Sequence, residues 1–497
     1  MRFKKHYTTK GLYIGKPEAE GETTSSGLNL LDFFEDYTNI EEHIQRGYFI
    51  VSGRKGSGKS AYAMWLHEKA KNNEGLYTSI IRKNEFDIEA IIQAIPEKDL
   101  KYEALFEWLI LVRLVKMILD TGQGTYLRQI KSLQDFYSKN SGYINIDKYV
   151  ITEIVANKEV NFSPLKRDFG IISKVLGNKS IKAPFYQMIG PLRQIITEVL
   201  RMDIFKNIHF YVMFDDLDVK FKLTNPQDQI QLMDLIRISR RDTTEYFNGL
   251  TAKVIIFIRD DIAERLDGVD CDKNKIFESY EYRINWYEHV VAKGNERQLI
   301  LRRFINRRLS KGFASLNIPY IQEDPWLSFV DVNNNNKMTQ FKYILDFTFY
   351  LPRDLMLIFK NIGNKDLHLS LSHEDINQLL KEYSKKKIRE IRDELVAIFE
   401  KNTIDLIFDT LRDINNGWDV EYKEVLNFLR KYNLPSQTFF TLIDYNLLVP
   451  VEKETGYLYF NYREKELDGE WEQYTFRTPK VLSKYFQTRY NIEFNHF

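Results

Sequence analysis

Residues 53–60 read Gly-Arg-Lys-Gly-Ser-Gly-Lys-Ser, a complete G-x-x-x-x-G-K-[ST] pattern. The apolar run 48–51 precedes it and a predicted helix at 60–69 follows it, which is the strand–loop–helix context that this pattern requires. The glycines let successive backbone N–H groups converge at the positive end of the helix, where a triphosphate binds. We expect Lys59 to reach the β- and γ-phosphates and Ser60 to bind Mg²⁺. A glycine-rich turn without a ligand is the alternative.

The sequence also indicates which nucleotide binds. GTP-binding proteins read guanine with N-K-x-D, and the nearest approach here, Asn-Lys-Asp-Leu at 364–367, is one residue short. The kinase pattern H-R-D does not occur in the sequence. We therefore expect ATP with Mg²⁺. The loop residues expected to contact it are Gly53, Arg54, Lys55, Gly56, Ser57, Gly58, Lys59, Ser60 and Ala61.

Paired acids follow a second apolar run. Residues 209–214 predict a buried strand, and Asp215 and Asp216 come directly after it. We expect Asp215 to hold Mg²⁺ through its water shell and Asp216 to orient or polarise the attacking water. A simple helix start is the alternative. Vigorous ATPases usually place Glu at the second position, so hydrolysis is expected to be slow or switch-like.

Arginines form a further group of candidates. Arg259 follows the apolar run 252–258, and ligands of parallel sheets bind at the carboxyl ends of the strands. We expect it to sense the γ-phosphate, or else to pair with Asp215, Asp216 or Asp260. Arg353, in Leu-Pro-Arg-Asp, is expected to reach the nucleotide as a second sensor, although Pro352 and Asp354 fit a helix start equally well. Arg240 or Arg241 remains a candidate arginine finger, a residue that would reach the nucleotide site of a neighbouring subunit.

Composition excludes several classes of protein. A chain of 497 residues suggests roughly three domains. The charges of Lys+Arg (71) and Asp+Glu (70) nearly cancel, so the net charge of the chain does not favour nucleic acid as a partner. Cys271 is the only cysteine, which excludes an intrachain disulfide framework. The start of the chain has no apolar secretory core, and charges interrupt the apolar stretch 105–119. We expect a cytoplasmic protein with no membrane partner.

The order of the patterns predicts four regions. They are an N-terminal lead-in (1–45), a nucleotide-binding α/β core (46–290) with a helical insertion at about 85–205, a helical lid (291–383) and a winged-helix-like domain (384–497). Helices are predicted at 372–383 and 385–401, with strands at 456–462 and 471–476. The arginine run 297–308 is typical of a solvated helix face.

The motifs also support a family resemblance. In this order, the chain carries the glycine loop, Asp-Asp-Leu-Asp, Ile-Phe-Ile-Arg-Asp-Asp and Leu-Pro-Arg-Asp. With them it resembles the bacterial P-loop ATPases related to the KAP and STAND groups, over roughly residues 11–490. The resemblance implies an additional-strand (ASCE) P-loop core, a lid and a winged-helix-like end. It also implies a nucleotide-driven switch or assembly platform, often encoded in anti-phage loci. Lys59, Ser60, Asp215, Asp216, Arg259 and Arg353 would keep the roles given above.

Three hypotheses follow for function. The first is an Mg²⁺-dependent ATPase switch that forms homo-oligomers and controls an effector protein in antiviral defence. The second is a DNA-binding AAA+-like remodeller, but the candidate recognition helix 436–448 has no Lys or Arg, whereas groove-binding helices need cations. Its exposed positions are predicted to be Gln437, Thr438, Asp444 and Asn446. Weak DNA contact through Arg463, Lys465, Arg477 and Lys480 stays open. The third is an ATP-binding scaffold without hydrolysis, against which the acid pair argues.

Overall fold

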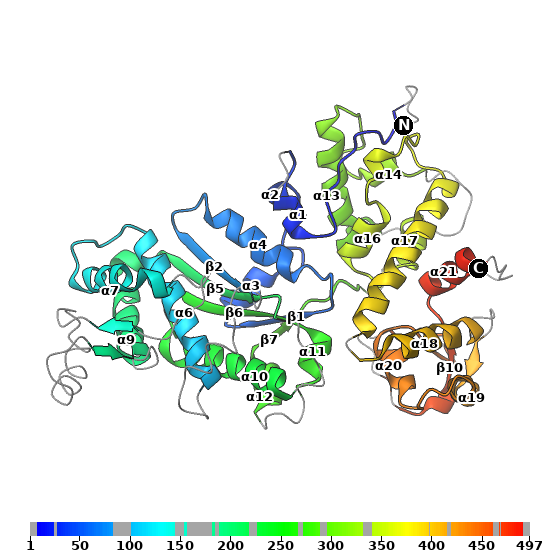
Figure 1. The fold of residues 1–497 in the computed structure, drawn as a ribbon. Helices are drawn as coiled ribbons and strands as arrows, with labels where there is room; N and C mark the ends of the chain where they lie inside the picture. Colours follow the sequence, from blue (N-terminus) through cyan, green and yellow to red (C-terminus); the bar gives the residue numbers. More distant parts are fainter. Residues whose placement is uncertain are drawn as a thin grey trace. The chain divides into compact units, whose positions relative to one another are not determined.

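The chain forms two compact units in the computed structural model (Figure 1). The first unit comprises residues 1–37, 56–58 and 285–497, and the second comprises 38–55 and 59–284. The structure describes residues 7–23, 27–82, 101–144, 154–156, 181–183, 188–217, 226–266, 272–288, 296–331, 340–396, 398–414, 419–460, 467 and 469–490. Cys271, Arg463, Lys465 and residues 461–462 of a predicted strand lie outside these ranges.

A five-stranded parallel sheet forms the centre of the second unit, which confirms the predicted α/β class. Its order is β2-β5-β6-β1-β7, so that β6 lies between β1 and β5. The central strands are continuous apolar runs because helices cover both faces. The strands are β1 (Ile50–Gly53), β2 (Leu76–Arg82), β5 (His209–Asp215), β6 (Ala252–Arg259) and β7 (Glu281–Arg283). The apolar runs 48–51, 209–214 and 252–258 predicted β1, β5 and β6, and a weaker apolar run at 76–81 predicted β2, whereas the short edge strand β7 was missed.

Helices lie on both sides of this sheet. In Figure 1, α4 (Lys59–Ala70) lies above the strands, whereas α6 (Lys101–Asp120) and α10 (Pro226–Arg241) lie below them. The other described elements of the unit are α3 (Ile40–Gln45), α7 (Arg128–Ile144), α9 (Ile189–Leu200), α11 (Asp260–Glu264), α12 (Lys273–Tyr280), the short helices η3 (Asp203–Phe205) and η4 (Asp242–Tyr246), and the paired strands β3 (Ile154–Ala156) and β4 (Ile181–Ala183).

The region predicted as an insertion contributes to the core of the sheet. Leu105 and Leu109 of α6 belong to the same buried apolar cluster as Val212 and Phe214 of β5. This region contains helices, as predicted, and also the pair β3–β4, which the sequence did not indicate. The helical part that faces the sheet is therefore part of the hydrophobic core.

A buried charge network joins three helices of this unit. Glu107 of α6 pairs with both Arg193 of α9 and Arg241 of α10, and Nη2 of Arg241 lies 2.5 Å from Oε2 of Glu107. Burial, followed by the charge of Glu107, raises the pKa of Asp242 from 3.8 to about 8. Arg241, a candidate finger residue, thus has an intramolecular partner in this structure.

The first unit is mainly helical. Its described helices are α1 (Ala19–Thr23), α2 (Leu30–Phe33), η5 (Glu296–Gln298), α13 (Ile300–Ser315), α14 (Trp326–Phe329), α15 (Gln340–Leu345), α16 (Pro352–Ile358), η6 (Ile362–Asn364), α17 (His373–Leu395), α18 (Lys401–Ile414), α19 (Tyr422–Lys431), α20 (Thr438–Asp444), η7 (Trp471–Gln473) and α21 (Lys480–Tyr490). A small antiparallel sheet has the order β8-β10-β9, with β8 (Val420–Glu421), β9 (Val449–Glu452) and β10 (Tyr474–Arg477).

The N-terminal segment packs closely along this unit. The amide of Gly11 donates to the carbonyl of Gly363 at 2.8 Å, and the amide of Leu369 donates to that of Tyr7 at 2.9 Å. A Cβ atom at Gly363 would lie 2.4 Å from the carbonyl oxygen of Leu12, so only glycine allows this approach. The segment before the glycine loop is thereby fixed against residues more than 350 positions later.

One predicted helix break is wrong. The sequence predicted separate helices at 372–383 and 385–401, but α17 is continuous from His373 to Leu395. Ser384 is buried, and its hydroxyl donates to the carbonyl of Lys381 at 2.9 Å inside the helix. Because no Gly or Pro interrupts this stretch, nothing ends the helix there.

The interpretation of the arginine run as a solvated face is also wrong in part. Arg302 and Arg308 of α13 are 4% and 5% exposed. Arg302 pairs with Asp324 at 3.0 Å, and Nη1 of Arg308 lies 2.6 Å from Oε1 of Glu22. A charge run cannot reveal distant acidic partners, and these acids come from segments before and after the helix.

Two details near the C-terminus also differ from the predictions. In the predicted strand 456–462, the described residues form only an isolated bridge, between Leu458 and Val451, and the strand of this region is β9. Thr438 and Asn446, predicted to be exposed, are buried, whereas Phe440 of α20 is 49% exposed. None of the described helices is long and apolar enough to cross a membrane.

Candidate functional site

The glycine loop, residues 53–60, connects β1 to α4. Gly56 and Gly58 have φ angles of +84° and +99°. Residues that carry a Cβ atom adopt such angles only at a cost in free energy. The buried Lys59 donates from Nζ to the carbonyl oxygens of Gly53 at 2.6 Å and Arg54 at 3.1 Å. The loop therefore folds around its own lysine, at the N-terminal end of a twelve-residue helix, where orphan backbone N–H groups attract anions.

Asp215 ends β5 and lies beside this helix. Its Oδ1 accepts a hydrogen bond from the Ser60 hydroxyl at 3.2 Å. The side chain is buried, and among the residues that the structure describes none hydrogen-bonds its Oδ2. Burial, and then the neighbouring charge of Asp216, raises the pKa of Asp215 from 3.8 to about 6. The structure thus brings the two predicted metal residues together.

This pair fits a divalent cation that also has phosphate and water ligands. Mg²⁺ prefers oxygen donors and keeps several waters, so one carboxylate and one hydroxyl are enough when a nucleotide supplies phosphates. The unpartnered Oδ2 of Asp215 is the donor that such an ion requires. The described residues contain no cluster of three or more His, Cys, Asp or Glu side chains that could hold a metal without a nucleotide.

Asp215 should make the stability of the ligand-free chain depend on pH. The folded carboxyl keeps its proton up to about pH 6, whereas in the unfolded chain it loses the proton near 3.8. The free energy of unfolding should therefore fall as pH rises from about 4 to about 6, and this contribution should be flat above that range. In urea titrations with EDTA, Asp215→Asn should show a smaller fall than the wild type across this window. Equal falls would contradict the assignment.

Asp216 has an unusual backbone and an unexpected partner. Its φ is +53°, in the left-handed region that few residues other than glycine adopt. Nε of Arg82, the last residue of β2, lies 3.5 Å from its Oδ2. Arg82 was not among the residues predicted from the sequence. The rule that selected Arg259, an arginine directly after an apolar run, would also have selected Arg82 after 76–81.

Arg259 ends β6, directly beside Gly53 of β1 in the parallel register. Its guanidinium is held by Asp261, with Nε at 2.9 Å from Oδ1 and Nη2 at 2.6 Å from Oδ2. This ion pair is with Asp261, an acid that was not among the predicted partners, and the role of Arg259 at the γ-phosphate stays a prediction. Asp261 lies in the first turn of α11, where a helix N-terminus favours a negative charge.

Arg353 lies in the first turn of α16, directly after Pro352, so the helix-start reading of Leu-Pro-Arg-Asp is confirmed. Its Nη2 lies 2.8 Å from Oε1 of Glu390 and 3.7 Å from Oε1 of Glu18. Its aliphatic part lies against the glycine loop, because a Cβ atom at Gly56 would be 2.7 Å from Cδ of Arg353. Gly56 and Arg353 belong to the same compact unit.

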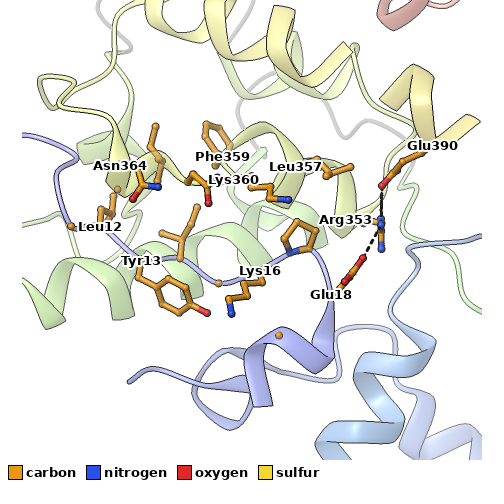
Figure 2. A pocket seen from close by; sticks show the side chains of 18 residues that line it. Leu12, Tyr13, Lys16, Glu18, Arg353, Leu357, Phe359, Lys360, Asn364 and Glu390 are labelled. Atoms are coloured by element: carbon orange, nitrogen blue, oxygen red, sulfur yellow. Dashed lines mark hydrogen bonds and ion pairs between the residues drawn. The ribbon is translucent and has the colours of Figure 1, made fainter. Parts of the chain in front are cut away.

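Arg353 also lines a cavity of about 440 Å³ within the first unit. Figure 2 shows Arg353 between Glu18 and Glu390 at one end, with Leu12, Phe359 and Asn364 toward the other. Backbone of the N-terminal segment 11–18 forms one wall, and residues 357–364 form the opposite wall. Lys16, Lys360 and Arg353 bring positive charge to the lining, and Glu18 and Glu390 bring negative charge.

One family of known proteins matches part of the chain. Residues 300–392 are similar to the FunZ-associated C-terminal helical domain. This range begins with α13 and ends near the end of α17. It includes Arg353, and a further segment, 393–497, follows it. No curated protein matches the chain.

Proposed function

We propose that the chain is an Mg²⁺-dependent ATP-binding and hydrolysing switch. The observation that carries this proposal is the buried Asp215, whose Oδ2 has no described partner while its Oδ1 contacts Ser60 of the glycine loop. A buried carboxylate without a full set of hydrogen bonds is costly, and binding of a cation there would remove that cost.

The strand order supports an additional-strand (ASCE) P-loop core. In such a core another strand separates the strand before the glycine loop from the strand that ends in acids. Here β6 lies between β1 and β5. The carboxyl ends of these three strands bring Gly53, Asp215 and Arg259 to one edge of the sheet.

The proposed mechanism assigns one task to each side chain. Lys59 exchanges its contacts with the loop carbonyls for the β- and γ-phosphates, and Ser60 and Asp215 hold Mg²⁺. When bound, Mg²⁺ neutralises charge on the phosphates. Asp216 orients the attacking water. Arg259 would stabilise charge on the γ-phosphate after its guanidinium separates from Asp261. The need to break this ion pair gives a physical reason for slow turnover.

Arg353 is proposed as the second sensor, as the resemblance implies. Glu18 and Glu390 now neutralise Arg353, so a nucleotide would compete with them for its guanidinium.

We further propose that the C-terminal part is winged-helix-like and contacts protein. The small sheet β8-β10-β9 and the helices α18 to α20 support the first point. The exposed Phe440 on α20 and the absence of Lys and Arg from that helix favour a protein partner over DNA. An effector in anti-phage defence remains the proposed target of the switch, by the resemblance given above.

Two measurements on the purified chain test the proposal. We expect slow phosphate release from ATP that requires Mg²⁺, and a molar mass in light scattering that rises when ATP and Mg²⁺ are added. A nucleotide-independent mass would argue against an assembling switch, and bound ATP without phosphate release would favour the scaffold. Salt-sensitive duplex binding at micromolar affinity or better would favour the DNA remodeller.

A further inference from the structure

Arg82 is placed beside the acid pair by the register of the sheet. β2 and β5 run parallel from Leu76 opposite His209 to Arg82 opposite Asp215. Arg82 is the last described residue of β2, and Asp216 directly follows β5. Their side chains meet with Nε of Arg82 3.5 Å from Oδ2 of Asp216.

The contact involves a carboxylate that the fold holds in an uncommon conformation. A φ of +53° at a residue other than glycine is retained when the surroundings over-determine it, and such residues cluster at functional sites. The side chains of Arg82 and Asp216 are 22% and 37% exposed. The pair is thus accessible to water and to a ligand, whereas the neighbouring Asp215 is buried.

Two carboxylates on adjacent residues repel each other, and a cation at the same edge offsets that repulsion. The Arg82 guanidinium cannot lose its charge and is planar, so its attraction favours one orientation of the carboxylate beside it. Lys59 is directed to the loop carbonyls and Arg259 to Asp261. Arg82 forms an ion pair with Asp216.

We propose that Arg82 is a positioning residue, whose guanidinium holds the Asp216 carboxylate in the orientation that it needs to act on the attacking water. The proposal rests on the proposed ATPase function. Arg82 acts through Asp216 and not on the phosphates, so its loss should slow the chemical step without weakening nucleotide binding. A role in folding alone would lower the melting temperature and leave the chemical step unchanged.

The test compares Arg82→Met, Arg82→Lys, Asp216→Asn and the double variant R82M/D216N. For each, kcat and KM for Mg²⁺·ATP, the nucleotide-induced melting shift and the ligand-free melting temperature are measured. We expect Arg82→Met to lower kcat about 10- to 100-fold, as the loss of supporting contacts to a functional group typically does. KM and the melting shift should stay within about twofold of wild type, and Arg82→Lys should recover part of the rate. Arg46→Met, at an exposed pair with Glu42, is the matched control and should change nothing.

The double variant distinguishes positioning from an independent effect. If Arg82 acts through Asp216, R82M/D216N should be no slower than Asp216→Asn, because residues that act as a unit are not additive. A full additional loss in the double variant, or wild-type kcat in Arg82→Met, would overturn the inference and leave the proposed function intact. Equal losses in kcat and in the melting shift would also overturn it. Absence of turnover in the wild-type chain would overturn the proposed function and this inference together.

Discussion

Lys59→Ala is expected to abolish the stabilisation of the chain by ATP. Nζ of Lys59 donates to two carbonyls of the loop that would surround the phosphates. Hydrogen bonds to charged groups contribute about 1.5–3 kcal/mol each, so the loss of two phosphate contacts should weaken binding by roughly 100- to 10,000-fold. At ATP concentrations about 100 times the wild-type Kd, the wild type gains about 2.7 kcal/mol. The variant should gain almost nothing.

Thermal melting with and without Mg²⁺·ATP measures this difference. Lys71→Ala provides the matched control, because Lys71 directly follows α4 and forms an exposed pair with Glu68. The control should keep the full nucleotide-induced shift. A shift in Lys59→Ala equal to that of the wild type would show that the nucleotide does not bind at this loop, and the remaining site assignments would lose their basis.

The sequence alone predicted the features that depend on which residues follow one another locally along the chain. The runs 209–214 and 252–258 predicted β5 and β6 because strands covered on both faces must be continuously apolar. The ends of these strands then placed Asp215 and Arg259 at one edge of the sheet. The contact between Ser60 and Asp215 follows from this rule, although the two residues are 155 positions apart.

The remaining features depend on partners that no local pattern identifies. Arg308 lies on a helix with a charged sequence, and only the fold shows that Glu22 meets it. The pairing of Arg259 with Asp261 competes with the role predicted for Arg259. Arg82 follows a short strand of weak pattern, so its position beside Asp216 becomes evident only once β2 is paired with β5. Long-range ion pairs are therefore the part of the site that the sequence predicted least well.

Asp216→Asn is expected to convert the chain into a stable ATP complex. The amide has nearly the same shape as the carboxylate, but it cannot accept a proton or orient water as a base does. Loss of a positioned base typically lowers kcat about 100- to 10,000-fold, while Lys59, Ser60 and Asp215 still hold the nucleotide and metal. ATP should therefore remain intact on the protein through gel filtration, and single-turnover hydrolysis should be slow.

The outcome of this experiment separates chemistry from binding. Asp203→Asn is the control, because its side chain is 89% exposed in the same unit and pairs only at the surface with Lys206. Turnover in Asp216→Asn that equals the wild-type rate would assign the water-orienting role to another residue. Loss of ATP binding together with turnover would instead assign Asp216 to the metal site with Asp215. Asp216 is partly exposed, whereas Asp215 is buried. We therefore expect changes at Asp216 to affect the rate of hydrolysis and changes at Asp215 to affect the affinity for Mg²⁺ and nucleotide.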